Sequence, residues 1–425
     1  MYCDILVIGA GVLGLSSACH LKRRNPGKRV LVIDMFGSPG QGNTAKSAGI
    51  FLNLYASEAN YLLADSTIDW LFHLQNGLGY DLGLAKYGYL YLLSGARHDA
   101  LRGPIERMRR NGVEVRTFER EELERMIPDL VTEFNDEEAE LMGLEPVEHG
   151  VLGVKCGCVD TDVLARSLES EFLKLGGEVA YNTTASGLIL RPERELGVDG
   201  EPFVWQGTHI AGAETDRGEI WAGTTVVAAG VWSERLLGAV GLDPMMRPKK
   251  RVMFVFKDQR LQRLWGTRGF SEHDALPFTH LPGMRVYLKA DLAEGSIWLG
   301  CADDFGRRYG LEDDPQPESS LYSNNIYHAL VRYFPCFEVV RPVNMWAGQR
   351  SINRYDAVPV VAPSPGMIYV GSATGSGITK CDALGRTVAA VYAGEKEVEL
   401  YGGRRLEAAS LWVEKRSVEK ETFKP

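Results

Sequence analysis

Hydrophobic and polar positions follow two periods along the chain, and the change of period marks its elements. The chain opens with an apolar run over residues 5–8, which is followed by a stretch of helical periodicity. A second apolar run covers residues 30–33 and is followed by an acidic residue. A buried strand, a helix and another buried strand in this order are typical of a β-α-β unit. The pattern therefore predicts a parallel sheet at the start of the chain.

Further along, the same two patterns alternate and predict a mixed α/β protein. Helices are expected from Ser57 to Gly77 and over residues 98–110, 120–126, 163–175, 321–333 and 382–392. Strands are expected over residues 88–93, 178–181, 203–219, 221–230, 252–256, 286–289, 296–300 and 367–371. Because the middle of the chain consists mainly of strand patterns, we expect one nucleotide-binding fold that is interrupted by a β-rich lobe.

The turn between the first strand and the first helix carries glycines at positions 9, 11 and 14. Gly9 permits a sharp turn, Gly11 lets backbone N–H groups approach a pyrophosphate, and Gly14 lets the helix pack closely on the strand. Asp34 follows about 20 residues later, where a carboxylate accepts hydrogen bonds from a ribose and repels a 2′-phosphate. The motif predicts a site for FAD or NAD rather than NADP.

Composition narrows the class of protein further. The 425 residues suffice for two or three domains, and a net charge of −9 argues against a nucleic-acid partner. Glycines and polar residues interrupt the apolar stretch 5–21, so no membrane span is expected. Seven cysteines are scattered, and the close pair Cys156 and Cys158 fits neither a redox motif nor a zinc motif. We expect reduced thiols, no metal site and a cytoplasmic protein.

Four further segments extend the glycine motif, and they run over residues 43–49, 226–233, 346–359 and 369–379. With the opening β-α-β unit, they resemble the D-amino-acid oxidase superfamily of FAD-dependent oxidoreductases, which includes sarcosine oxidase, glycine oxidase and dimethylglycine dehydrogenase. The segments follow the family's order and cover the chain to about residue 395. Five ordered matches are much more specific than a single glycine motif.

The resemblance implies a Rossmann-like FAD-binding domain with an inserted antiparallel β-rich (α+β) substrate domain. A discontinuous FAD-binding domain is expected over residues 1–86, 150–232 and 335–395, and the substrate domain over 87–149 and 233–334. Residues 396–425 form a C-terminal tail of helical character, to which the sequence assigns no function.

The resemblance also implies the residues that bind FAD. Gly230 ends a buried strand where a side chain would collide with the cofactor, and the last helix begins where its positive end can face the flavin. No histidine lies within 37–55 and no cysteine within 341–356, so FAD is expected to bind non-covalently. The expected set is Gly9, Gly11, Leu13, Gly14, Asp34, Met35, Asn43, Thr44, Ser47, Ala48, Gly49, Ala185, Gly230, Trp232, Gly348, Gly375, Ser376, Gly377, Ile378 and Thr379.

Substrate-binding residues are expected in the segment 346–359 and on the predicted strand 286–289. Arg350 corresponds in the resemblance to the arginine that binds the substrate carboxylate in glycine oxidase-like members, with a salt bridge to Asp356 as the alternative role. Tyr287 and Lys289 alternate along one strand, so the two side chains can share the face toward the cofactor. His280 is expected to lie in a loop and to form a hydrogen bond with the backbone. A position in the substrate site is the less favoured alternative.

These expectations lead to one function and two alternatives. The sequence predicts an FAD-dependent oxidoreductase that oxidises a small amine or amino acid, with oxygen, a quinone or an electron-transfer protein as the acceptor. The stretch 50–55 lacks the arginine of sarcosine oxidase-like members, which favours an apolar substrate side chain or ring. The alternatives are a 2-hydroxy-acid dehydrogenase, in which His280 acts as the base, and a flavoprotein subunit or assembly factor of a larger complex. The sequence does not identify the electron acceptor. It also leaves open whether the protein forms a homo-oligomer.

Overall fold

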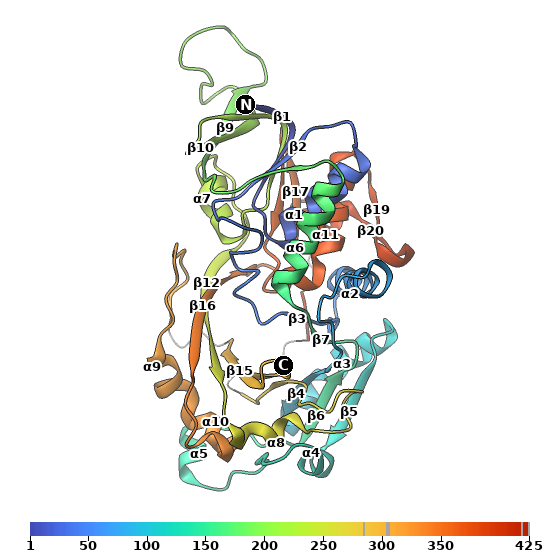
Figure 1. Ribbon diagram of the computed structural model, residues 1–425, viewed down its shortest axis with the longest axis vertical. Coiled ribbons are helices and arrows are strands. Elements are labelled where there is room, and N and C mark those ends of the chain that lie inside the picture. Colours follow the sequence, from blue (N-terminus) through green and yellow to red (C-terminus); the bar gives the residue numbers. More distant parts are fainter. Residues whose placement is uncertain (284, 303–306, 418–419, 424–425) are drawn as a thin grey trace.

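The computed structural model describes residues 1–283, 285–302, 307–417 and 420–423, and its strands form two large sheets (Figure 1). The first sheet contains the opening β-α-β unit, and its central strands are parallel. Its order is β17 (Val360–Ser364), β18 (Met367–Gly371), β11 (Ile220–Val227), β1 (Tyr2–Ile8), β2 (Val30–Ile33) and β8 (Glu178–Ala180), with β10 (Thr208–Thr215) beside β11 and β9 (Ala185–Pro192) beside β10.

Helices cover the first sheet and bury its apolar side chains in a common core. They are α1 (Val12–Arg24), α2 (Glu58–Leu78), α6 (Thr161–Lys174) and α11 (Gly377–Tyr392). α1 is buried on most of its surface because α6 and α11 pack beside it. The close approach of α11 depends on Gly385, where a Cβ atom would collide with Ser16 of α1.

The second sheet lies in the lower half of Figure 1 and is mainly antiparallel. Its order is β16 (Asn344–Ile352), β12 (Arg247–Phe256), β15 (Ser296–Cys301), β14 (Val286–Asp291), β13 (Phe278–His280), β4 (Tyr89–Leu93), β6 (His149–Gly153) and β5 (Val115–Glu119). A separate hydrophobic core fills the space between this sheet and its helices. The expected fold class, a Rossmann-like domain with an inserted β-rich domain, is confirmed.

Shorter elements connect the two sheets and cover the second one. The helices are α3 (Gly95–Arg110), α4 (Arg120–Met126), α5 (Glu137–Leu141), α7 (Ser233–Gly238), α8 (Gln262–Trp265), α9 (Ser319–Leu321) and α10 (Tyr327–Tyr333), with a π-helical turn over Tyr322–Ile326. The strands β3 (Ile50–Phe51) and β7 (Gly157–Cys158) form a two-stranded sheet. In the described part of the chain, no helix is long and apolar enough to cross a membrane.

Two strands join the second sheet although their residues were expected in the FAD-binding domain. β6 begins at His149 and pairs with β4 and β5, whereas the expected boundary fell at residue 150. β16 lies within the expected segment 335–395 but pairs with β12 along its whole length. Strand pairing between distant segments decides this membership, and local periodicity carries no information about it. The remaining domain boundaries stay a prediction.

Three expected elements also differ from the structure in extent. α2 continues beyond Gly77 and ends at Gly79, whose φ of 76° is the left-handed conformation that terminates a helix. α11 begins at Gly377, five residues before Asp382, where the sequence pattern placed its start. The tail was expected to be helical, but it forms a hairpin of β19 (Glu397–Glu399) and β20 (Arg405–Glu407). Gly402 and Gly403 both have a φ of 77°, which permits the turn of this hairpin.

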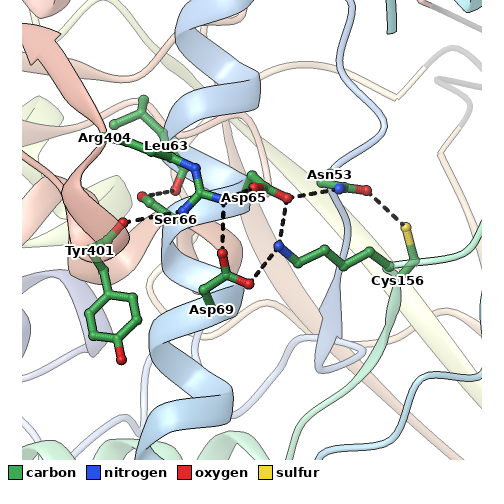
Figure 2. A network of polar contacts seen from close by, with 9 residues as sticks. Asn53, Leu63, Asp65, Ser66, Asp69, Cys156, Tyr401 and Arg404 are labelled. Carbon is green, nitrogen blue, oxygen red and sulfur yellow. Dashed lines mark hydrogen bonds and ion pairs between the residues drawn. The ribbon is translucent and has the colours of Figure 1, made fainter. Parts of the chain in front are cut away.

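A network of partly buried polar contacts fastens the tail to α2 (Figure 2). The guanidinium of Arg404 contacts the carboxylates of Asp65 and Asp69 on α2. Lys155 reaches the same two carboxylates, at 2.8 and 2.6 Å. The amide of Asn53 donates to Asp65 at 3.0 Å, which connects the network to the segment after β3. The hairpin therefore belongs to the same packed unit as α2.

Candidate functional site

A cavity of about 870 Å³ lies between the two sheets, and residues of both sheets line it. This volume is in the range of small-molecule and cofactor sites. Of the 20 residues expected to bind FAD, 18 line the cavity: Gly9, Gly11, Leu13, Asp34, Met35, Asn43, Thr44, Ser47, Ala48, Gly49, Ala185, Gly230, Trp232, Gly348, Gly375, Ser376, Gly377 and Ile378. Segments that are far apart in the sequence therefore meet at one site.

The glycine-rich turn has the geometry that its motif predicts. Gly9 has a φ of 111°, and a Cβ atom there would lie 2.5 Å from the carbonyl oxygen of Ala228. A Cβ atom on Gly14 would collide with the Gly9 carbonyl, so this glycine permits the close packing of α1 on β1. A Cβ atom on Gly11 would meet only Thr44 Oγ1 at 3.5 Å, which leaves the space beyond it open. The start of α1 thus borders the cavity, with Thr44 Oγ1 as the nearest side-chain atom to Gly11.

Asp34 lies at the end of β2 and contacts the same turn. Its Oδ2 accepts a hydrogen bond from the N–H of Ala10 at 2.6 Å, and its Oδ1 accepts one from Phe36 at 2.8 Å. Burial raises the pKa of this carboxyl group, and the two N–H donors oppose that shift. Each oxygen keeps a further lone pair, which suits a carboxylate that also accepts from a ribose.

The geometry fits the adenine-dinucleotide part of FAD. Val12 begins α1 directly after Gly11, which has no side chain to cap the helix, and the N–H of Val12 donates to Thr44 Oγ1 at 3.4 Å. The N-terminus of α1 lies at the cavity, where its positive end is suited to a pyrophosphate. A Cβ atom on Gly230 would meet nothing within 4 Å, consistent with a space that a cofactor fills. The loop 43–49 is held beside β16 because Asn43 Oδ1 accepts from the N–H of Gln349 at 2.8 Å.

Three expected site residues do not line the cavity. Gly14 serves the packing of α1 on β1, and the Thr379 hydroxyl donates to the Ile50 carbonyl at 3.4 Å. The ammonium of Lys289 lies 4.0 Å from the ring centroid of Trp298 and 3.7 Å from Asp291. Lys289 shares a face of β14 with Tyr287, but two residues of a strand span about 7 Å, which carries it beyond the cavity.

Arg350, on β16, is the cation that the structure places against the cavity as expected. Its guanidinium packs against Gly375, where any Cβ atom would collide with it. Among the described residues, no acid forms an ion pair with Arg350, because Asp356 pairs with Arg416 of the tail at 2.8 Å. The neighbouring Arg354 is exposed and lies 5.2 Å from the ring centroid of Tyr309. The charge of Arg350 is therefore available to a ligand.

Aromatic side chains surround the end of the cavity near Arg350. The ring centroids of Tyr287 and Phe278 are 5.0 Å apart, and those of His280 and Tyr91 are also 5.0 Å apart. His280 lies on β13 and lines the cavity, so the expected loop position is wrong. Burial lowers its pKa to about 3, and the charges of Arg350 and Arg285 act in the same direction. The imidazole is therefore neutral at pH 7 and is a proton acceptor.

Sequence reasoning missed several residues of the cavity. Lys380, in the first turns of α11, donates to Asn60 Oδ1 at 2.7 Å and lies 4.3 Å from the ring centroid of Tyr55. Burial lowers the pKa of Lys380 to about 7, against the charge of Glu421, and Arg350 lowers it further. Lys380 precedes the expected start of the apolar helix at Asp382, so the helix pattern did not mark it as buried. Glu421 and the nearby Phe423 carried no signal either, because only the fold brings the tail to the cavity.

The similarities to known proteins agree with this site. A family model described as "FAD dependent oxidoreductase" (DAO) matches residues 4–391, so the chain belongs to this family. The bovine (Bos taurus) FAD-dependent oxidoreductase domain-containing protein 1 is 24% identical over 420 residues, which cover 91% of this chain and 80% of that protein. An L-2-hydroxyglutarate dehydrogenase from Escherichia coli is 26% identical over 246 residues, 57% of this chain and 50% of that protein.

The fold has a close counterpart among solved structures. The L-proline dehydrogenase from P. horikoshii superimposes with a TM-score of 0.72 at 18% identity, over 93% of this chain and 94% of that chain. The resemblance to the D-amino-acid oxidase superfamily and the prediction of FAD as the cofactor are confirmed. The protein is an FAD-dependent oxidoreductase, and the described residues contain no cluster of three or more metal-binding side chains.

Proposed function

We propose that this protein oxidises a small amine or amino acid and that Arg350 binds the substrate carboxylate. The observation that carries the proposal is the position of Arg350. It lines the cavity, and Asp356, the acid considered as its partner, pairs with Arg416 instead. An arginine fork forms two parallel hydrogen bonds with a carboxylate. Among the described residues of β16 and α11 that line the cavity, none carries a carboxylate that could pair with Arg350.

The remaining wall residues suit a substrate with an apolar part. Leu52 and Leu54 line the cavity where an arginine was missing from the family pattern. Together with Tyr89, Phe278 and Tyr287, they form an apolar surface that excludes water and strengthens the attraction between Arg350 and a carboxylate. The Tyr287 ring, which is partly buried and lines the cavity with Arg350, would limit how the bound substrate rotates. The bound flavin supplies the acceptor for the electrons of the substrate.

A second candidate is a 2-hydroxy acid, and His280 favours it. Oxidation of an alcohol requires a base for the hydroxyl proton, and His280 is a histidine that lines the cavity. Its lowered pKa keeps the imidazole free of a proton but makes it a weak base, so this candidate requires the bound ligands to raise that pKa. The name of the related E. coli protein, an L-2-hydroxyglutarate dehydrogenase, supports the same class. A neutral amine needs no such base, so the two candidates differ in their dependence on His280.

An anaerobic titration of the FAD-loaded protein distinguishes the candidates. Proline, sarcosine and D-amino acids are compared with lactate and 2-hydroxyglutarate, and bleaching of the flavin absorbance is the readout. Bleaching by amines alone supports the proposal, and bleaching by hydroxy acids alone supports the second candidate. If no compound bleaches the flavin and a partner co-purifies, the protein is a subunit or assembly factor, and both enzyme proposals fail.

Arg350→Met tests the proposed role of the guanidinium. We expect the KM for a carboxylate substrate to rise by two to three orders of magnitude, the range of about 3–4 kcal/mol for a buried charge-assisted pair. FAD content should not change. Arg354→Met is the matched control, because this arginine is exposed on the same segment. An unchanged KM in Arg350→Met would contradict the role. The electron acceptor, the oligomeric state and the cytoplasmic location stay predictions.

A further inference from the structure

The tail reaches the cavity although it lies outside the part of the chain that the family model matches. That match ends at residue 391, whereas Glu421 and Phe423 line the cavity. Ion pairs fasten the tail along its course. Arg404 contacts Asp65 and Asp69 of α2, and Arg416 pairs with Asp356 beyond the end of β16. The tail is therefore held against the same elements that carry the site residues.

The carboxylate of Glu421 is held at the N-terminus of α2. Its Oε1 accepts from the N–H of Ala56 at 2.9 Å, and its Oε2 accepts from the N–H and the hydroxyl of Ser57 at 3.2 and 3.1 Å. Oε1 also accepts from the N–H of Phe423 at 2.9 Å. Only 6% of Glu421 is exposed. A carboxylate in this position compensates the positive end of the helix and fixes the tail at the cavity.

Phe423 continues the aromatic wall of the cavity. Its ring lies edge-on to Tyr91, with the centroids 5.3 Å apart, and 5% of the residue is exposed. It belongs to one apolar cluster with Leu54, Tyr89 and Phe278, which all line the cavity. Thr422, between the two buried residues, is exposed. The segment thus presents alternate side chains to the cavity, as an extended chain does.

We propose that Glu421 and Phe423 complete the wall of the substrate cavity and that Phe423 limits the size of the apolar group a substrate can carry. The inference rests on the proposed function, because it takes this cavity as the substrate site. The ligand class is a small carboxylate with an apolar substituent, which Arg350 holds at its charged end. Glu421 is a positioning residue, since it acts by holding the segment in place.

Binding of two carboxylates to the FAD-loaded protein tests the wall. Acetate and phenylacetate differ by one ring, and their affinities are measured by calorimetry and by the shift of the flavin absorbance. We expect Phe423→Ala to tighten phenylacetate relative to acetate by about tenfold, because the substitution makes room for the ring. Thr422→Ala is the matched control and should leave the ratio unchanged. An unchanged ratio in Phe423→Ala overturns the inference.

Failure of the proposed function gives a different result. If neither acid binds to the wild-type protein, the carboxylate site fails, and amide hydrogen exchange then decides the position of the tail. We expect Glu421→Ala to accelerate exchange at Ala56 and Ser57, whose N–H groups lose their acceptor. If exchange at these two amides stays as slow as in the wild type, the segment does not form the wall and the inference is wrong.

Discussion

The guanidinium of Arg416 lies 2.8 Å from the carboxylate of Asp356, and each side chain is at most 3% exposed. Arg416 also donates to the carbonyl oxygen of Pro359 at 2.8 Å, so it ties the tail to the segment between β16 and β17. Asp356 thus has Arg416 as its ionic partner, and Arg350, six residues earlier in the sequence, lines the cavity. A residue of the tail therefore pairs with the acid that the sequence left open to Arg350.

Arg416→Met should destabilise the protein, because Asp356 then remains buried without its ionic partner. The expected loss in the free energy of unfolding is about 3 kcal/mol, the usual cost of breaking a buried pair from one side. Urea denaturation of the FAD-loaded protein measures it. Arg405→Met is the control, since the pair of Arg405 with Glu397 is exposed. A loss below that of the control would contradict the structural role of the Arg416–Asp356 pair.

Gly11→Val should yield a folded protein that contains little FAD. The added side chain would project past Thr44 Oγ1 into the open space in front of α1, where the pyrophosphate is expected. The measurement is the ratio of flavin absorbance to protein absorbance after purification, with circular dichroism as the check of folding. Gly27→Ala serves as the control, because a Cβ atom there meets nothing within 4 Å. A normal FAD content in Gly11→Val would argue against this placement of the pyrophosphate.

Lys380 should give the stability of the protein a distinct dependence on pH. Burial lowers its pKa to about 7, so between pH 7 and its ordinary pKa of 10.5 the unfolded chain binds a proton that the folded protein does not. The free energy of unfolding should therefore rise with pH across this window, and the gain should be lost as pH falls toward 7. The nearby charges are Glu421, which raises the pKa, and Arg350, which lowers it.

Lys380→Met isolates this contribution, because the methionine does not titrate. Urea unfolding is measured at several pH values from 6 to 10, and the wild-type slope should exceed the slope of the variant. Lys420→Met is the control, since Lys420 is exposed and should leave the slope unchanged. Parallel curves for the wild type and Lys380→Met would show that the lysine keeps its ordinary pKa in the folded protein.

FAD should be released when the protein is denatured with acid. The loop 37–55 contains no histidine and the segment 341–356 no cysteine, and these are the positions at which a covalent bond was considered. After precipitation, the expected distribution is yellow supernatant over a colourless pellet, measured by absorbance at the flavin band. Flavin that stays with the pellet after repeated washing would contradict non-covalent binding.

Local sequence information predicted the strand, turn and helix start that the fold places at the cavity. The spacing of Gly9, Gly11 and Gly14 and the position of Asp34 follow from the geometry of one β-α-β unit, so neighbouring residues determine them. The resemblance of four further segments added the loops that meet this unit. The alternation of helices and strands also sufficed for the fold class, because period and length of an apolar run reflect how each element is buried.

Only the tertiary structure decided which residues of distant segments contact one another. The sequence alone left Asp356 open to Arg350, and the fold assigned it to Arg416 of the tail. It also moved Lys289 away from the cavity and brought Lys380 and Phe423 to it. Such contacts depend on strand pairing and on the packing of segments that are not neighbours in the sequence. Local periodicity records which face of an element is buried, but not which residues lie opposite that face.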